Sequence, residues 1–263
     1  EGMVLMGAAL GFIAAVVTGH AGLGIIAAIL AGMMMSVLFA FLAVTLVSNQ
    51  VATGLALTIF GTGLSGFLGA GYVGMAIDGI APFPIPFLSD IPVIGKVLFS
   101  HDPLVYVSWV MFALIFWCFR STRLGLTIRA VGENPEAANA IGIPVMKVRY
   151  GAILFGGAMA GLAGAYLSLV YTPMWSEGMS AGRGWVVFAS WKAERILLGA
   201  YLFGAASIMH LVLQGLGFEA SPNLLAMLPY AATIIVLVII ASDAAKAKLS
   251  TPLALGQPYR PQV

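Results

Sequence analysis

Charged residues are scarce in this sequence of 263 residues. Lys and Arg number 12 and Asp and Glu number 10, which together make 8% of the chain, whereas 61% of the residues are hydrophobic. A soluble domain of this size needs far more charge to cover its surface. The few basic residues form no nucleic-acid-binding patch, so we expect no nucleic-acid partner. The composition predicts an all-α, polytopic helical membrane protein that sits in a lipid bilayer.

Cysteine and histidine are also rare. The single Cys118 cannot form an intrachain disulfide, and its apolar surroundings predict a small core side chain. The histidines His20, His101 and His210 are far apart and have no HExxH or CxxC partners, so no metal site is expected. A Walker A motif and a dinucleotide fingerprint are absent, so we expect no cofactor, and any ATP chemistry must lie on another chain. The sequence starts at Glu1 without an initiator Met or a signal-peptide pattern, so we expect that its beginning is missing.

Apolar runs long enough, or almost long enough, to cross a bilayer recur along the chain. The expected spans are Met3–Val17, Leu23–Val47, Val51–Leu68, Leu104–Phe119, Tyr150–Tyr171, Ile196–Gln214 and Leu225–Ala241. Gly184–Trp191 is apolar but too short to span alone, so it predicts either an exposed loop or a short, broken helix.

The basic residues set the expected topology. Five of them fall within residues 120–149, and Lys246 and Lys248 follow the last span, so the positive-inside rule places both regions in the cytoplasm. The Pro-rich segment 70–103 then lies outside. An even number of crossings must separate the two cytoplasmic regions, and this requires a crossing near Gly184–Trp191. We expect about eight crossings with both ends inside. The transmembrane domain covers 1–241, with a cytoplasmic loop at 120–149 and an external loop at 70–103, and a cytoplasmic tail covers 242–263.

The longest polar stretch, RAVGENPEAANAIG (Arg129–Gly142), predicts a short capped helix. It combines an N-cap asparagine, a proline at the first helical position and a glutamate near the positive end of the helix dipole. Alanines follow, and a glycine suits a left-handed stop. A helix of about two turns is not stable alone, so it must dock, either on a cytoplasmic partner or only on its own chain. The defining residues are Asn134, Pro135, Glu136, Ala137, Ala138 and Gly142.

The pattern Glu136-Ala137-Ala138, three residues and Gly142 resembles the EAA…G loop of ABC importer permeases, whose short coupling helix seats in a groove on the ATP-binding subunit. The wider stretch LGLTIRAVGENPEAANAIGI is similar to that loop in permeases of the branched-chain amino acid, ribose and nucleoside group, above all those of simple-sugar and nucleoside importers. That family has two more helices before the EGM segment, so the family-like fold expected here lacks its first two helices. Other similar segments are EGMVLMGA at the start, SNQVATGLAL (Ser48–Leu57), GRGW (Gly182–Trp185) and LLGAYLFGA (Leu197–Ala205).

The resemblance implies a transmembrane subunit of an importer that moves a simple sugar, a nucleoside or a similar small polar solute into the cell. ATP hydrolysis on a partner subunit would drive this transport, so the chain itself would be no enzyme. The implied partners are two ATP-binding subunits, a second permease subunit (the same or different) and an extracytoplasmic solute-binding protein. The implied location is the bacterial inner membrane, crossed several times. The six residues of the capped helix would then contact the ATPase.

Asn49 and Gln50 are uncharged amides at a break between two apolar segments. Transporters often place broken helices at their binding region, and amides can donate and accept hydrogen bonds to a hydroxylated solute. The alternative is a polar hairpin at the cytoplasmic face, which the crossing count favours. Together with Thr53 and Gly54, these residues form the candidate translocation path.

Parts of the sequence are also compatible with two other functions. A secondary transporter or channel that works without ATP would need an ionisable residue in mid-membrane, and none of the expected spans contains Asp, Glu, Lys or Arg. Gly63–Gly66 matches the GxSG motif of intramembrane serine proteases, with His210 as a possible base for Ser65. Because matches of this kind are common in a Gly-rich chain, Ser65 is expected to be a small packing residue.

Small residues and aromatic residues mark further expected contacts. Glycines four residues apart predict closely packed helices, and the pairs are Gly7 with Gly11 and Gly157 with Gly161. Aromatic side chains near the ends of spans are expected to anchor at the membrane interface, and these are Tyr171, Trp175 and Trp185.

Overall fold

The computed structural model describes residues 1–87, 89, 91, 95, 98–182, 193–216, 227, 230–231, 234–235, 252–257 and 259. The regular elements of this part are helices, joined by two isolated β-bridges between the segments 73–76 and 174–175. The all-α expectation is therefore confirmed. The helices are α1 (Gly2–Thr18), α2 (Ala21–Ala40), α3 (Gln50–Gly69), α5 (Pro103–Ser121), α6 (Arg123–Glu133), α7 (Pro135–Ala140), α8 (Val145–Tyr166) and α9 (Ala193–Gly215). Short π-helices continue α2 (η1, Phe41–Thr45) and α8 (η3, Leu167–Tyr171), and a 3-10 turn follows α3 (η2, Ala70–Tyr72).

Several of these helices can cross a membrane. Within the described part, the helices long and apolar enough to do so are Ala21–Thr45, Gln50–Tyr72, Pro103–Ser121 and Val145–Tyr171. Shorter apolar helices occur at Gly2–Thr18 and within α9. Six of the expected spans thus correspond to helices. The expected span Leu225–Ala241 lies mostly outside the described residues, and Gly184–Trp191 lies wholly outside them.

The expected loop at 120–149 is more ordered than the sequence suggested. It contains α6, which begins after Thr122, whose hydroxyl accepts a hydrogen bond from the Gly125 amide at 3.1 Å. α8 begins at Val145 and not at Tyr150, because Pro144 ends the preceding segment and its carbonyl starts the helical hydrogen bonding. Lys147 and Arg149 therefore lie in the first turns of α8, ahead of the expected span Tyr150–Tyr171.

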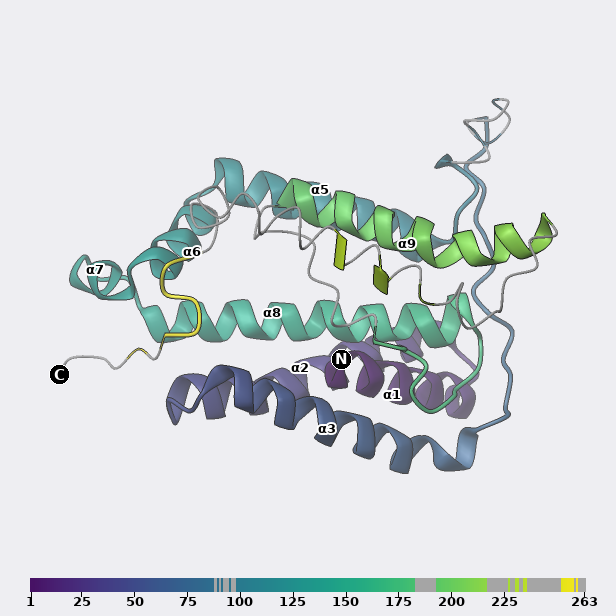
Figure 1. The fold of residues 1–263 in the computed structure, drawn as a ribbon, viewed down its shortest axis with the longest axis horizontal. Helices are drawn as coiled ribbons and strands as arrows, with labels where there is room; N and C mark the ends of the chain where they lie inside the picture. Colours follow the sequence, from purple (N-terminus) through teal and green to yellow (C-terminus); the bar gives the residue numbers. More distant parts are fainter. Residues whose placement is uncertain are drawn as a thin grey trace.

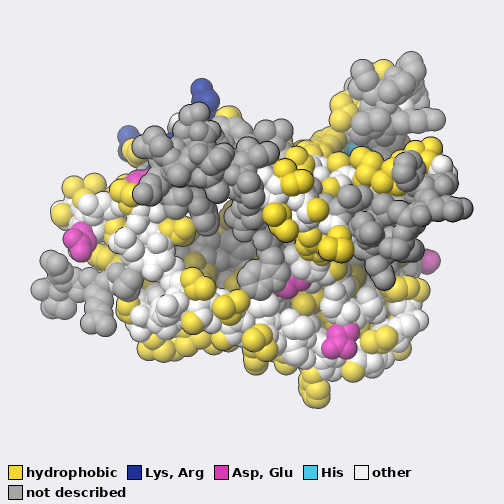
Figure 2. Space-filling model, viewed as in Figure 1, with side chains coloured by type: hydrophobic (Ala, Val, Ile, Leu, Met, Phe, Trp, Pro, Cys, Tyr) yellow, Lys and Arg dark blue, Asp and Glu magenta, His cyan; other side chains and the backbone are white. Residues whose placement is uncertain are grey.

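α1 is the central helix and packs against α2, α3 and α8. Figure 1 shows these four helices side by side, with α5 and α9 together across the molecule from them. α6 and α7 lie at one end, and the segment 73–102 leaves the opposite end. Figure 2 shows hydrophobic side chains over much of the described surface on this face, with Lys and Arg side chains at the end that carries α6.

Glycines allow the backbones of the central helices to touch. A Cβ atom added to Gly7 would lie 2.7 Å from the Cα of Gly161, so α1 meets α8 backbone to backbone. A Cβ atom on Gly32 would lie 2.1 Å from the carbonyl oxygen of Gly157, so α2 meets α8 in the same way. The close packing predicted from the spacing of these glycines is confirmed, and it is the contact that small residues provide within a bilayer.

Trp175 is not an interfacial anchor, which corrects that prediction. Its side chain is 1% exposed and belongs to the main buried cluster, together with Leu5, Phe12 and Leu169. The indole turns inward because residues 174–175 form β-bridges with the segment 73–76. Gly69 leaves room for the ring, since a Cβ atom added to Gly69 would lie 2.1 Å from the indole nitrogen. Tyr171 is exposed, as an anchor requires, and Trp185 lies outside the described residues.

Candidate functional site

α7 has the caps that its sequence predicts. The side chain of Asn134 accepts a hydrogen bond from the Ala137 amide at 2.9 Å, and Pro135 occupies the first turn with Glu136. Gly142 has a φ of 84°, the left-handed conformation that ends a helix, and its amide donates to the Asn139 carbonyl at 2.9 Å. The short capped helix is therefore confirmed.

α7 uses one face for its own chain and leaves the rest exposed. Ala138 is 2% exposed and packs in a cluster with Val131, Val145 and Tyr259, so its side chain cannot meet a partner directly. Pro135 is half-buried. The candidate contact residues that remain exposed are Asn134, Glu136, Ala137 and Gly142.

One exposed side chain beside α7 was not singled out from the sequence. Ile141 follows the helix directly and is 76% exposed, although its neighbourhood is polar. Single exposed apolar side chains are common on protein surfaces, so the exposure of Ile141 becomes informative only together with the docking role of α7. The available signal was an isoleucine immediately before the predicted stop at Gly142.

Asn49 and Thr53 stabilise the start of α3. The Asn49 side chain caps the helix by accepting hydrogen bonds from the amides of Val51 and Ala52, each at 3.0 Å. Thr53 is buried, and its hydroxyl donates to the Asn49 carbonyl at 2.8 Å and lies 2.9 Å from the hydroxyl of Ser48. These two predicted path residues therefore stabilise the non-helical segment between η1 and α3.

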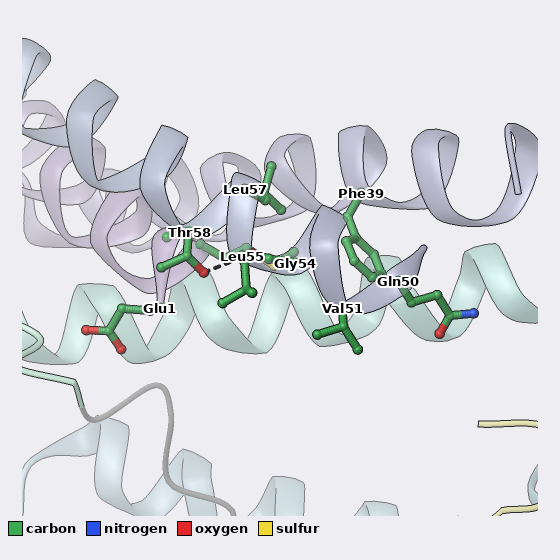
Figure 3. A pocket seen from close by; sticks show the side chains of 10 residues that line it. Glu1, Phe39, Gln50, Val51, Gly54, Leu55, Leu57 and Thr58 are labelled. Atoms are coloured by element: carbon green, nitrogen blue, oxygen red, sulfur yellow. Dashed lines mark hydrogen bonds between the residues drawn. The ribbon is translucent and has the colours of Figure 1, made fainter. Parts of the chain in front are cut away.

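Gln50 and Gly54 line a cavity of about 370 Å³ on α3. Figure 3 shows Glu1 and Gln50 at opposite ends of this pocket, with Val51 and Leu55 between them. The structure thus brings two of the four predicted path residues to the pocket and leaves Asn49 and Thr53 in the helix cap beside it. An apolar wall with a few polar groups is the usual composition of a small-molecule site. The other lining residues are Gly2, Met3, Phe39, Leu57 and Thr58.

Glu1 is the residue of this site that sequence reasoning missed. It precedes α1, and its carboxylate accepts a hydrogen bond from the Gly182 amide at 2.9 Å and another from the Ser180 hydroxyl. Ser180 itself is fully buried. The signal was in the sequence, because Glu1 is the one Asp, Glu, Lys or Arg among the first 77 residues.

Ser65 has the environment of a packing residue. It is 2% exposed within α3, and its hydroxyl donates to the Thr62 carbonyl at 3.0 Å. This internal hydrogen bond is the ordinary one for a serine in a membrane helix. The side chain of His210 lies outside the described residues.

Comparison with known proteins identifies the family. The pattern of the family described as the permease component of the branched-chain amino acid transport system matches residues 1–241, and this chain belongs to that family. A relative from Haloferax volcanii, provisionally named a glucose ABC transporter permease protein, is 37% identical over 98% of this chain and 87% of its own. No solved structure matches this chain.

Two further relatives carry nucleoside names. The nucleoside ABC transporter permease protein NupC of Lactococcus lactis is 31% identical over 78% of this chain and 68% of its own length. The guanosine ABC transporter permease protein NupQ of Bacillus subtilis is 31% identical over 86% of this chain and 73% of its own length.

The chain is therefore the permease subunit of an ATP-binding-cassette transporter, a multi-pass membrane protein and not itself an enzyme. Such a subunit works with an ATPase and a binding protein. The alternative functions, an ATP-independent transporter and an intramembrane protease, are set aside by this membership.

Proposed function

We propose that this permease passes a simple sugar, a nucleoside or a similar small polar solute into the cell. The observation that carries the proposal is that relatives named for glucose, nucleoside or guanosine transport align with 78–98% of this chain. The pocket on α3 supports it, because the amide of Gln50 suits hydroxyl groups and the apolar wall beside it suits a sugar face or a base.

The membrane topology belongs to the same proposal. Residues 1–241 form the transmembrane domain, with about eight crossings, a cytoplasmic loop at 120–149, an external loop at 70–103 and a cytoplasmic tail at 242–263. The arrangement in Figure 1 supports this assignment, since α6, α7 and residues 252–257 lie together at one end and the segment 73–102 leaves the other. The relatives include archaeal and bacterial chains, so we propose that the protein lies in a prokaryotic cell membrane. The more specific proposal is the bacterial inner membrane.

The proposed partners follow from α7. Two ATP-binding subunits, a second permease subunit (the same or different) and an extracytoplasmic solute-binding protein would complete the importer. α7 would seat on an ATPase through Asn134, Glu136, Ala137 and Gly142, which are exposed, with Pro135 at the edge of the contact. Ala138 would hold α7 on its own chain, and Ile141 would add an apolar contact.

The path for the solute would follow the pocket. Gln50 and Gly54 line it directly, whereas Asn49 and Thr53 would fix the helix start that carries them. Movement of α7 during ATP hydrolysis would reach this region through α8, since the Tyr150 hydroxyl on α8 is hydrogen-bonded to the Thr45 hydroxyl on η1.

The test is reconstitution of the chain with its ATPase and binding-protein partners in proteoliposomes. We expect ATP-dependent uptake of glucose or of a nucleoside, and the solute that is the better substrate should inhibit uptake of the other. Glu136→Lys should lower both uptake and stimulated ATP hydrolysis several-fold while the subunit stays in the membrane, because lysine at the first turn opposes the helix dipole. Uptake of leucine in place of both solutes would overturn the proposed substrate class.

A further inference from the structure

Residues 252–257 and Tyr259 lie at the base of α7. Tyr259 is 7% exposed and shares one buried cluster with Val131 of α6, Ala138 of α7 and Val145 of α8. Ala138 is the buried residue of α7, so this cluster is the seat of the short helix on its own chain. An aromatic ring from the C-terminal segment therefore completes that seat.

Further contacts join the same segment to α6 and to α8. The Ala254 amide donates a hydrogen bond to the Gly132 carbonyl at 2.9 Å, which joins the segment to α6. The Arg149 guanidinium carbon lies 5.5 Å from the centroid of the Tyr259 ring, within the range of a cation–π contact. An Arg149 nitrogen also donates to the Gln257 carbonyl at 3.5 Å, which joins the segment to α8.

These contacts matter because α7 has six residues, far fewer than a helix needs to keep its place alone. A force from an ATPase subunit reaches the membrane helices only if α7 moves together with α6 and α8. From these contacts we propose that residues 252–257 and Tyr259 brace α7 against α6 and α8, with Tyr259 as the positioning residue that keeps α7 coupled to the membrane helices. The inference rests on the proposed docking role of α7.

The contact itself can be tested without any partner. A Cβ atom on Gly132 would lie 3.5 Å from the Cβ of Pro252, a separation that a disulfide accepts. In the full chain with Cys118→Ala, the pair Gly132→Cys and Pro252→Cys should form a disulfide under mild oxidation in native membranes. The control pair, Gly132→Cys with Phe87→Cys, should not, because residue 87 belongs to the segment at the opposite end. Equal yields from the two pairs would overturn the brace.

The function of the brace is tested in the complete transporter. Tyr259→Ala should increase the ATP hydrolysed per solute imported at least threefold, and Tyr259→Phe should restore the ratio, since phenylalanine keeps the ring. Leu253→Ala is the matched control, because this side chain lies in the same segment and is 69% exposed. A change that merely reduced folding would lower the amount of inserted complex and leave the ratio unaltered.

Hydrogen exchange separates this inference from the docking role. In the permease alone, amides of residues 137–141 should exchange severalfold faster in Tyr259→Ala than in Leu253→Ala. If Glu136→Lys leaves coupling intact, the docking role fails while the exchange result still supports the brace. If Glu136→Lys uncouples the transporter but Tyr259→Ala changes neither exchange nor the ratio, the brace is overturned.

Discussion

The carboxylate of Glu1 accepts a hydrogen bond of 2.9 Å from the backbone amide of Gly182, across 181 positions of the sequence. The hydroxyl of the buried Ser180 donates to the same oxygen. Because Glu1 directly precedes α1 and also lines the pocket on α3, this contact ties residues 180–182 to the central helices at the proposed solute path.

Glu1→Ala should lower stability and uptake together. Two donors lose a charged acceptor, and hydrogen bonds to charged groups contribute about 1.5–3 kcal/mol. We expect a lower Tm for the purified transporter and a several-fold loss of solute uptake, with Glu1→Gln intermediate because its amide oxygen still accepts. Glu133→Ala, an exposed glutamate at the end of α6, is the control and should leave both unchanged. A wild-type Tm in Glu1→Ala would show that the tie to residues 180–182 is unimportant.

Gly142→Val should uncouple transport without blocking insertion. A Cβ atom at Gly142 meets nothing within 4 Å, so the cost arises from its φ of 84°, at about 1–2 kcal/mol for a residue with a side chain. We expect uptake to fall several-fold at equal membrane content. Gly151→Ala is matched to it, since its Cβ also enters open space but within the regular helix α8. Full ATPase coupling in Gly142→Val would contradict a docking role for this loop.

Asn49→Ala should lower the stability of the protein, whereas Gln50→Ala should weaken solute uptake. Asn49→Ala removes two cap hydrogen bonds and should lower stability by about 1 kcal/mol, with Asn49→Ser close to wild type because serine also caps helices. Gln50→Ala should raise the KM for uptake several-fold with an unchanged Tm, because Gln50 faces the pocket. Uptake by both alanine variants should be compared at matched expression with excess binding protein. An unchanged KM in Gln50→Ala would remove Gln50 from the path.

Labelling from outside the cell should reach the 70–103 loop and not the α7 loop. In a Cys118→Ala background, Phe87→Cys should react rapidly with an impermeant thiol reagent, since Phe87 is 90% exposed. Asn134→Cys should react only after permeabilisation, because basic residues gather around α7 and the positive-inside rule predicts that they face the cytoplasm. The same result is expected at Lys248, whose position lies outside the described residues. Rapid labelling at position 134 in intact cells would invert the topology.

Local signals in the sequence predicted local structure well. Asn134, Pro135 and Gly142 define α7 within nine residues, and the structure confirms their caps and the left-handed stop. α6 was missed because its residues Arg123–Glu133 are neither apolar enough for a span nor marked by a proline, although Thr122 offered an N-cap. A search for amphipathic helices within polar loops would have found it.

Contacts between distant segments were beyond the reach of sequence patterns. The pocket depends on Glu1, Phe39 and Gln50, which come from three separate elements. Tyr259 belongs to the segment expected only to be a cytoplasmic tail, and its burial depends on α6, α7 and α8 folding together. Trp175 was assigned to the interface on chemical type alone, but the bridges to 73–76 decide its direction.

The buried indole of Trp175 has a spectroscopic consequence. Among buried side-chain nitrogen and oxygen atoms of the described residues, its indole nitrogen is the one without a hydrogen-bond partner. An indole buried to this degree, 1% exposed, emits at short wavelength and is shielded from aqueous quenchers. Four other tryptophans, Trp109, Trp117, Trp185 and Trp191, can be replaced by phenylalanine to isolate its signal. Trp175 would then report, as intrinsic fluorescence, each time solvent reaches the junction of α1, α3 and η3 during a transport cycle.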